Sequence, residues 1–215
     1  AFEPVGGEAA VPYEPRQRLP KPWNQEETIA HFASWHNRTP GRVVLKDYNY
    51  RKPDLDLEVS VPESPVLPEV FYEYGDHYGE VEAGVRLAKI RAEEIACRER
   101  VYAGKGDARG FRAGGTFELG RHYRADFNRG YLLTEVEHVG EQALELGGRG
   151  SRQTYSNTFS CVPAETPFRP RRATRKPRVV GLLNAKIDGG GDGQYAEIDA
   201  EGRYKIVLPF DLSGR

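Results

Sequence analysis

Alternating apolar and polar residues along the chain predict a series of short β-strands. The first two strands are expected at 42–48 and 57–61, and a proline follows each run and limits its extension. Three further strands are expected at 116–119, 131–136 and 157–162, where glycine-rich or polar turns separate the runs. The pattern therefore predicts a mainly β fold with a minor helical part, of the α+β class.

A long helix is expected over about residues 80–100. Its apolar residues recur at steps of three and four and form one stripe. The stripe consists of Val81, Val85, Ala88, Ala92 and Ile95. Ile90 and Cys97 lie on the far side, which indicates a helix either sandwiched within the domain or packed against a neighbouring subunit. Glu94 and Arg98 have the spacing of a favourable ion pair on the helix surface.

Residues 1 to about 40 are rich in proline and charge and are expected to be largely extended. One short helical patch is predicted at 26–35, because Ile29, Phe32 and Ala33 fall on one helical face. We place this segment at the start of a first domain that runs to residue 176.

A basic cluster, RPRRATRK, occupies residues 169–176. It reads either as a solvated or interface-facing linker, which is the more common case, or as a docking surface for an acidic partner. Beyond it, the pattern predicts a long strand at 179–188, a glycine loop at 189–193 and a β-hairpin that turns at 199–202. A small antiparallel barrel begins in this way, so residues 177–215 are expected to be an incomplete second domain whose open edges need a partner or further sequence.

The balance of charge argues against nucleic acid as a partner. The 215 residues include 31 basic and 32 acidic side chains, so no excess of positive charge is available to neutralise phosphates. The 9 Phe and 12 Tyr suit a sheet-rich core, and the 24 Gly and 15 Pro suit tight turns. No apolar run approaches the roughly 20 residues that span a bilayer. The sequence has no signal peptide, begins with Ala1 and contains no Met, so we expect a processed or excised piece of a longer protein.

Candidate metal-binding and nucleophilic groups are few. The two cysteines, Cys97 and Cys161, form no CxxC pair and are expected to be buried as small hydrophobic residues. The histidines are His31, His36, His77, His122 and His138. They show no HxH or HExxH spacing and are expected to lie at the surface near strand edges. A zinc site built from His77, His122 and His138 is the weaker alternative.

The remaining motifs give no catalytic pattern. The loop at 189–193 lacks the Lys-Ser/Thr pair and the helix of a phosphate-binding loop, and Asp188 and Asp192 lack the spacing of a calcium loop. No GxSxG motif occurs, and Glu93 and Glu94 are expected on the solvated face of the helix. We therefore expect no catalytic, cofactor-binding or metal-binding residues, and a structural protein rather than an enzyme.

Several motifs follow one another in a fixed order. They are DYNYRKP at 47–53, YEYGDHY at 72–78, LAKIRAE at 87–93, AGGTFEL at 113–119, NRGYLLTEVEH at 128–138, YSNTFSCVPA at 155–164, FRP at 168–170 and DAEGRYKI at 199–206. This series resembles the VgrG family (Rhs element Vgr), the spike proteins of type VI secretion systems, which are related to phage tail baseplate hub and spike proteins. One departure is Gly75-Asp76, which stands where the family has Pro-Gly, so a different turn is expected there.

The resemblance implies a partial phage-tail-hub-like β domain at 1–176, followed by the first strands of an OB-fold spike barrel at 177–215. It also implies a structural role: a homotrimer that sits on the tube, helps puncture target membranes and delivers effectors. The implied partners are an Hcp-like hexameric tube protein, baseplate proteins and, in a longer chain, tip or effector proteins, with transient contact with the target membrane. Assembly in the bacterial cytoplasm and export without a signal peptide to the extracellular space or target cell follow from the same resemblance.

Other readings stay open. The baseplate hub of a contractile phage tail, or of a phage-derived injection particle, would have the same fold. A spike that carries a cell-wall hydrolase domain beyond residue 215 is a second alternative. An OB-fold module that binds oligonucleotides or sugars is a third, and the net charge of −1 argues against its nucleic-acid form.

Overall fold

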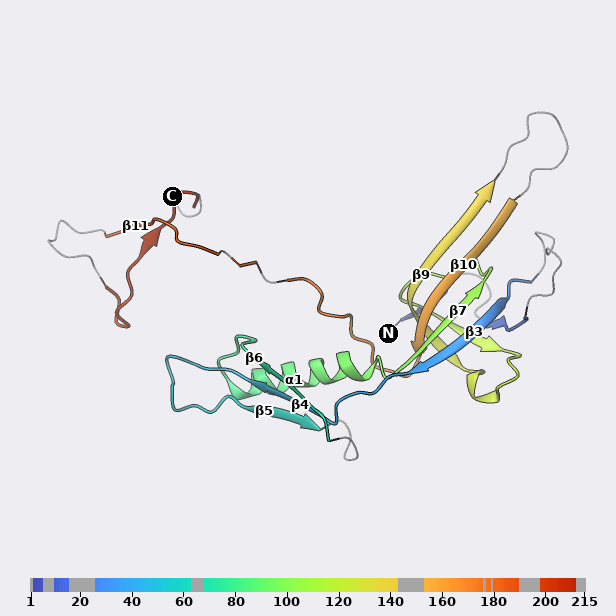
Figure 1. Cartoon of the computed structure of the whole chain (residues 1–215), viewed down its shortest axis with the longest axis horizontal. Coiled ribbons are helices and arrows are strands. Elements are labelled where there is room, and N and C mark those ends of the chain that lie inside the picture. Colours follow the sequence, from blue (N-terminus) through green and yellow to red (C-terminus); the bar gives the residue numbers. More distant parts are fainter. Residues whose placement is uncertain are drawn as a thin grey trace. The chain divides into compact units, whose positions relative to one another are not determined.

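The computed structural model describes most of the chain and divides it into two compact units, Ala1–Arg171 and Arg172–Arg215. The described residues are 2–5, 10–15, 26–62, 68–142, 153–175, 177–178, 180–189 and 198–211. Within them the fold is mainly β with one α-helix, which confirms the expected fold class (Figure 1). None of the described helices is long and apolar enough to cross a membrane.

The larger sheet of the first unit has the order β1-β8-β9-β10-β7-β3, with β2 also paired to β8 (Figure 1). Its strands are β1 Glu3–Pro4, β2 Ala10–Pro12, β3 Ile29–His36, β7 Arg100–Gly106, β8 Gly115–Gly120, β9 Gly130–Gln142 and β10 Gln153–Pro163. The strands predicted at 116–119, 131–136 and 157–162 are confirmed as parts of β8, β9 and β10. A bridge between Tyr13 and Ile29 joins the segment after β2 to β3, so the sheet curls back on itself at one end.

Aromatic rings fill the inside of this curled sheet. Phe32 contacts Tyr131, Tyr102 and Phe127, with ring centroids 5.2, 5.5 and 5.7 Å apart. Aromatic pairs at these separations stabilise a core beyond their burial alone. The 3₁₀ turn η1, Ala125–Phe127, closes this end of the core and places the Phe127 ring in it.

The segment predicted as a helical patch at 26–35 is instead the strand β3. Ile29 pairs with Gly106 and His31 pairs with Lys105, so the register shifts by one residue at Ala30. A bulge of this kind returns Ile29 and Phe32, which are three residues apart, to the same buried face. The spacing of three residues between Ile29 and Phe32 therefore resembled that of a helix, and the prediction of a helical patch at 26–35 was wrong.

The predicted long helix exists, as α1 Val81–Ala96, but it is shorter than expected. Cys97 is its C-cap residue, and β7 begins at Arg100, where the apolar pattern had still predicted helix. Val85 of the predicted stripe is exposed, whereas Gly84, Ala88 and Ala92 are buried. The buried face is thus made of small residues, because a sheet packs closely against it.

That sheet has three strands in the order β5-β4-β6, with α1 packed on one face (Figure 1). The strands are β4 Arg42–Lys46, β5 Val59–Pro62 and β6 Val70–Tyr74. β4 and β5 confirm the two strands predicted at 42–48 and 57–61. The buried side chains between sheet and helix form a second core. They are Val43, Leu45, Leu57, Val59, Tyr78, Ala88 and Ala92.

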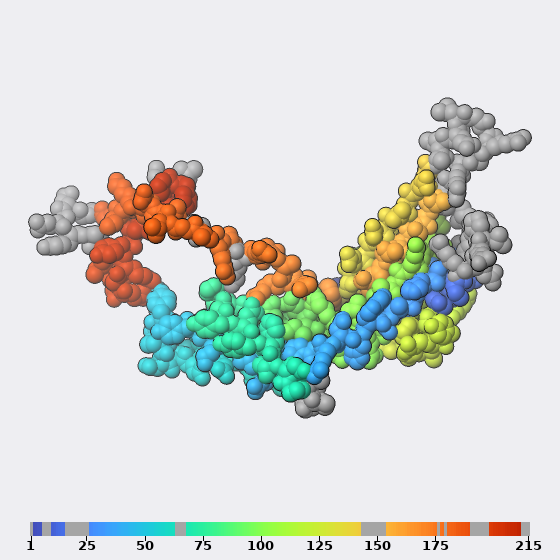
Figure 2. All heavy atoms as spheres, in the orientation of Figure 1, coloured from blue at the N-terminus to red at the C-terminus, as the bar shows by residue number. Residues whose placement is uncertain are grey.

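The second unit pairs β11 Lys186–Ile187 with β12 Ile206–Val207. The hairpin turn predicted at 199–202 is confirmed, with Gly202 at φ 77° and its N–H donating to the Asp199 carbonyl at 3.0 Å. The long strand predicted at 179–188 is confirmed only at Lys186–Ile187, because 180–185 form no strand and their side chains are exposed. Figure 2 draws the described residues of the second unit in orange and red. Most of the loop at 189–193 lies outside the described residues.

Candidate functional site

The three histidines considered as zinc ligands have separate surroundings. The backbone N–H of His77 donates to the Asp47 carboxylate at 2.5 Å, and His138 Nδ1 lies 2.6 Å from the Tyr155 hydroxyl. His122 is buried, so the expectation of a surface position was wrong for it. In the part of the chain that the structure describes, no three His, Cys, Asp or Glu side chains gather as a metal site would require.

His122 lies in an aromatic cage. Its ring centroid is 4.2 Å from Tyr13, 4.3 Å from Tyr123 and 4.8 Å from Phe127. Nδ1 accepts a hydrogen bond from the Arg124 backbone at 3.1 Å, while Nε2 has no partner among the described atoms. Burial lowers the pKa of this histidine, so the cage favours the neutral ring.

Both cysteines are free and buried, as expected. Burial raises the pKa of the Cys161 thiol, which makes it a poor nucleophile. Cys97 lies at the end of α1 and donates to the carbonyls of Glu94 and Arg169 at 3.3 and 3.6 Å. Arg169, the first residue of the basic cluster, also pairs with Glu93 at 2.6 Å. This contact fixes the start of the cluster to the helix.

Asp47 joins two of the sequence motifs. Its carboxylate accepts the backbone N–H groups of Tyr48, His77 and Tyr78 at 2.8, 2.5 and 3.1 Å. His77 has φ 63° and Gly75 has φ 90°, so the turn at Gly75-Asp76 uses left-handed backbone. The DYNYRKP motif thus anchors the loop between β6 and α1.

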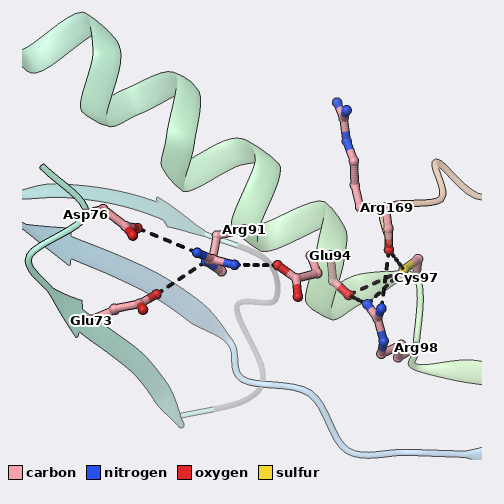
Figure 3. A network of polar contacts seen from close by, with 7 residues as sticks. All are labelled: Glu73, Asp76, Arg91, Glu94, Cys97, Arg98 and Arg169. Atoms are coloured by element: carbon pink, nitrogen blue, oxygen red, sulfur yellow. Dashed lines mark hydrogen bonds and ion pairs between the residues drawn. The ribbon is translucent and has the colours of Figure 1, made fainter. Parts of the chain in front are cut away.

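A charged cluster fixes β6 and the loop after it to the helix (Figure 3). Arg91 of α1 lies 3.3 Å from Glu73, 3.6 Å from Asp76 and 2.5 Å from Glu94. The Arg91 side chain is largely buried, at 12% exposure. Arg91 donates to the Glu94 carboxylate, and Arg98 donates to the Glu94 backbone carbonyl.

The face of the three-stranded sheet opposite α1 is exposed along β6, whereas Val44 at its centre is buried. We call it the tyrosine face, and it consists of Arg42, Val44, Lys46, Val70, Tyr72 and Tyr74. Alternation fixes its members, because Val43 and Leu45 of β4 and Phe71 of β6 face the helix. Tyr72 and Tyr74 are 56% and 60% exposed. They stand beside Val44 and Lys46 in the β4–β6 register.

A second feature is the outer part of the β9–β10 pair, which β7 extends from Asn157 onward and which is two-stranded only at 139–142 and 153–156. We call residues 134–142 and 154–160 the acidic ribbon. β8 pairs with β9 only at 130–132, so among the described residues β9 has an unpaired edge from Thr134 onward. Glu135, Glu137, Val139 and Glu141 alternate along one face of β9, opposite uncharged Ser and Thr side chains of β10.

The structure thus shows two sets of contacts that hold the loop between β6 and α1, around Asp47 and around Arg91, and two surfaces, the tyrosine face and the acidic ribbon. In the sequence analysis, Tyr72 and Tyr74 were noted only as part of the YEYGDHY motif at 72–78. The alternation of Val70, Tyr72 and Tyr74 could have revealed the exposed face, but the strand β6 was not predicted. The acidic ribbon was missed because its strand was expected to end at Val136.

The fold is mainly β, and comparison with known proteins identifies its family. The family model described as phage tail baseplate hub (GPD) matches residues 1–144. The chain belongs to this family.

Curated relatives agree. The type VI secretion system spike protein VgrG1c of Pseudomonas aeruginosa is 31% identical over 218 residues, which cover 98% of this chain and 29% of that protein. VgrG1b of the same species is 30% identical over 94% of this chain and 27% of its own length. The expected resemblance to VgrG proteins is confirmed. The chain spans less than a third of the length of these two relatives.

Two further likenesses complete the comparison. The actin cross-linking toxin VgrG1 of Vibrio cholerae is 30% identical over 79% of this chain, which corresponds to 16% of the toxin. A solved component of the type VI secretion system of E. coli shares 19% identity over 95% of this chain and 39% of its own, with a TM-score of 0.47.

Proposed function

We propose that this chain is the hub segment of a type VI secretion spike, with a structural role. The observation that carries the proposal is the match to VgrG spike proteins over nearly the whole chain, together with membership of the baseplate hub family. In this role residues 1–176 form part of the hub, and residues 177–215 begin the OB-fold barrel of the spike. Three copies assemble on an Hcp-like hexameric tube protein and help to puncture the target membrane.

The other partners follow from that position. Baseplate proteins hold the hub, and tip or effector proteins bind to parts of a longer chain. The spike assembles in the bacterial cytoplasm and leaves with the tube, reaching the extracellular space or the target cell. We propose no enzymatic activity and no cofactor for this segment, and the near-zero net charge of −1 supports partners other than nucleic acid.

The baseplate hub of a contractile phage tail, or of a phage-derived injection particle, is the second candidate. It is favoured by the family description, which names a phage tail baseplate hub. The names of the curated relatives favour the secretion spike. A cell-wall hydrolase domain carried beyond residue 215 is a weaker possibility that nothing within these residues supports.

The proposal is tested by measuring the solution mass of the full-length protein and its binding to purified tube protein. We expect a trimer that retains the hexameric tube protein on a column. A monomer that does not bind tube protein would contradict the hub role. Binding to the tube protein of a neighbouring phage cluster, but not to that of a secretion system, would favour the second candidate.

A further inference from the structure

We propose that the tyrosine face of one copy receives the acidic ribbon of a second copy. This inference rests on the proposed function, because it names the surfaces through which copies of the hub meet. It is argued from the sheet geometry and from the charges of the two surfaces.

The tyrosine face has the properties of a surface that becomes covered. The sheet is mixed, with β4 parallel to β6 and antiparallel to β5. Here α1 covers one face, and on the other face Val44 of the central strand is buried while the row along β6 is exposed. Val70, Tyr72 and Tyr74 are 48%, 56% and 60% exposed in one row. Tyrosines gathered on an exposed face are typical of the centre of protein–protein contacts.

The charge on this face is positive. Arg42 and Lys46 stand on β4 directly beside Val70 and Tyr74 of β6. Lys46 already pairs with Glu58 at 3.0 Å, whereas Arg42 has no ion pair within the described residues. A surface that binds the tyrosine face should therefore present carboxylates next to a small apolar side chain.

The acidic ribbon supplies that chemistry. Glu135, Glu137 and Glu141 project from the same face of β9, and Val139, which is 59% exposed, lies between them. Neither Glu135 nor Glu141 has an ion pair among the described residues, and Glu137 accepts only the Thr158 hydroxyl, at 3.4 Å. Around Val139 and Glu141 the ribbon is two-stranded, and a two-stranded ribbon is marginally stable by itself, so packing on a second surface would stabilise this end.

Packed face to face, the ribbon would place Val139 against the tyrosine rings and its carboxylates near Arg42 and Lys46. Sheets packed in this way lie about 10 Å apart, a distance that these side chains fill. Each copy carries one face and one ribbon, so the contact joins two different patches. A contact between unlike patches builds a closed ring when the rotation between copies closes, as a hub requires.

Charge reversal tests this contact. The face variant carries Arg42→Glu and Lys46→Glu, the ribbon variant carries Glu135→Lys and Glu137→Lys, and a combined variant carries all four changes. Arg112→Glu with Arg121→Glu is the matched control, since both arginines are exposed and lie outside the two surfaces. Self-association of each chain is measured by sedimentation equilibrium at low and high salt, and circular dichroism checks the fold.

We expect the unchanged chain to associate, and more weakly at high salt. Each two-charge variant should associate at least about tenfold more weakly, because like charges then meet across the contact. The control should match the unchanged chain. The combined variant should regain association, since its face is acidic and its ribbon is basic, and this rescue excludes a mere folding defect.

The contact is overturned if the chain stays monomeric, if either reversal leaves association unchanged, or if the combined variant does not recover. Charge reversals that leave self-association unchanged but abolish binding to tube protein would show that tube protein occupies the tyrosine face. This result would also overturn the proposed contact between copies. If the full-length trimer still forms and binds tube protein in any of these cases, the hub function stands and only this contact fails.

Discussion

Individual side chains of this chain gain their roles from burial that the sequence does not reveal. His122 is one such residue: its spacing from other histidines indicated a surface position, yet rings from Tyr13, Tyr123 and Phe127 enclose it. Gly104 is another, because it lies in β7, a strand that was not predicted from the sequence. In the structure it makes room for the ring of Phe159, its neighbour on β10.

The cage around His122 predicts a loss of stability in mild acid. Its pKa is lowered in the fold, so the unfolded chain binds this proton more readily than the folded chain. The free energy of unfolding should therefore decrease as pH falls through about 6.5, the ordinary histidine value, until the folded pKa is passed. Denaturant titrations over this range should show a flatter pH dependence for His122→Phe than for the unchanged chain.

His31→Phe is the matched control for this measurement, because His31 is exposed on the outer side of β3. It should keep the slope of the unchanged chain. Equal slopes for the unchanged chain and His122→Phe would show that the buried ring contributes nothing to the acid sensitivity.

Gly104→Ala should destabilise the curled sheet. A Cβ at this position would lie 2.3 Å from Cζ of Phe159, whose ring is held among Phe32, Phe111 and Phe117. Such overpacking costs about 1–3 kcal/mol. Gly120→Ala is the control, since no atom lies within 4 Å of the position that its added methyl group would take, and it should change the unfolding free energy little. Equal thermal midpoints for the two variants would contradict the tight packing at Gly104.

At the scale of elements, alternation located β4, β5, β8, β9 and β10, and the helical stripe located α1. The apolar pattern failed to predict elements where the backbone departs from the regular period of a strand or helix. The register shift in β3 made a strand look helical, and β7 was missed because it follows α1 after three residues without a glycine or proline. The strand predicted at 179–188 forms only at Lys186–Ile187 for a different reason: alternation stabilises a strand only when another layer covers its apolar side.

The attachment of β6 to α1 depends on Arg91. Arg91→Met should leave Glu73, Asp76 and Glu94 near one another without their shared cation. Removing one partner from a buried charge cluster costs about 3 kcal/mol. Chemical denaturation should show this loss, whereas Arg112→Met, which removes an exposed pair with Glu3, should cost less than about 1 kcal/mol. Similar effects of the two changes would mean that the cluster is only a surface feature.

For the whole molecule, the family was predictable because ordered motifs do not depend on knowing the strands that carry them. The assembly surfaces were not, since exposure of the tyrosine face and of the acidic ribbon depends on which strands pair and where pairing stops. The described part of the second unit contains none of the buried apolar residues and exposes Leu182 and Phe210.

The central claim is that this chain serves as the hub segment of a secretion spike. The most direct measurement replaces the matched 29% of the Pseudomonas aeruginosa spike protein VgrG1c with this chain and assays tube protein in the culture medium. A spike lacking the segment is the control and should release none. We expect the chimera to restore release of tube protein. A chimera that accumulates as a folded protein while tube protein stays inside the cells would contradict the hub role.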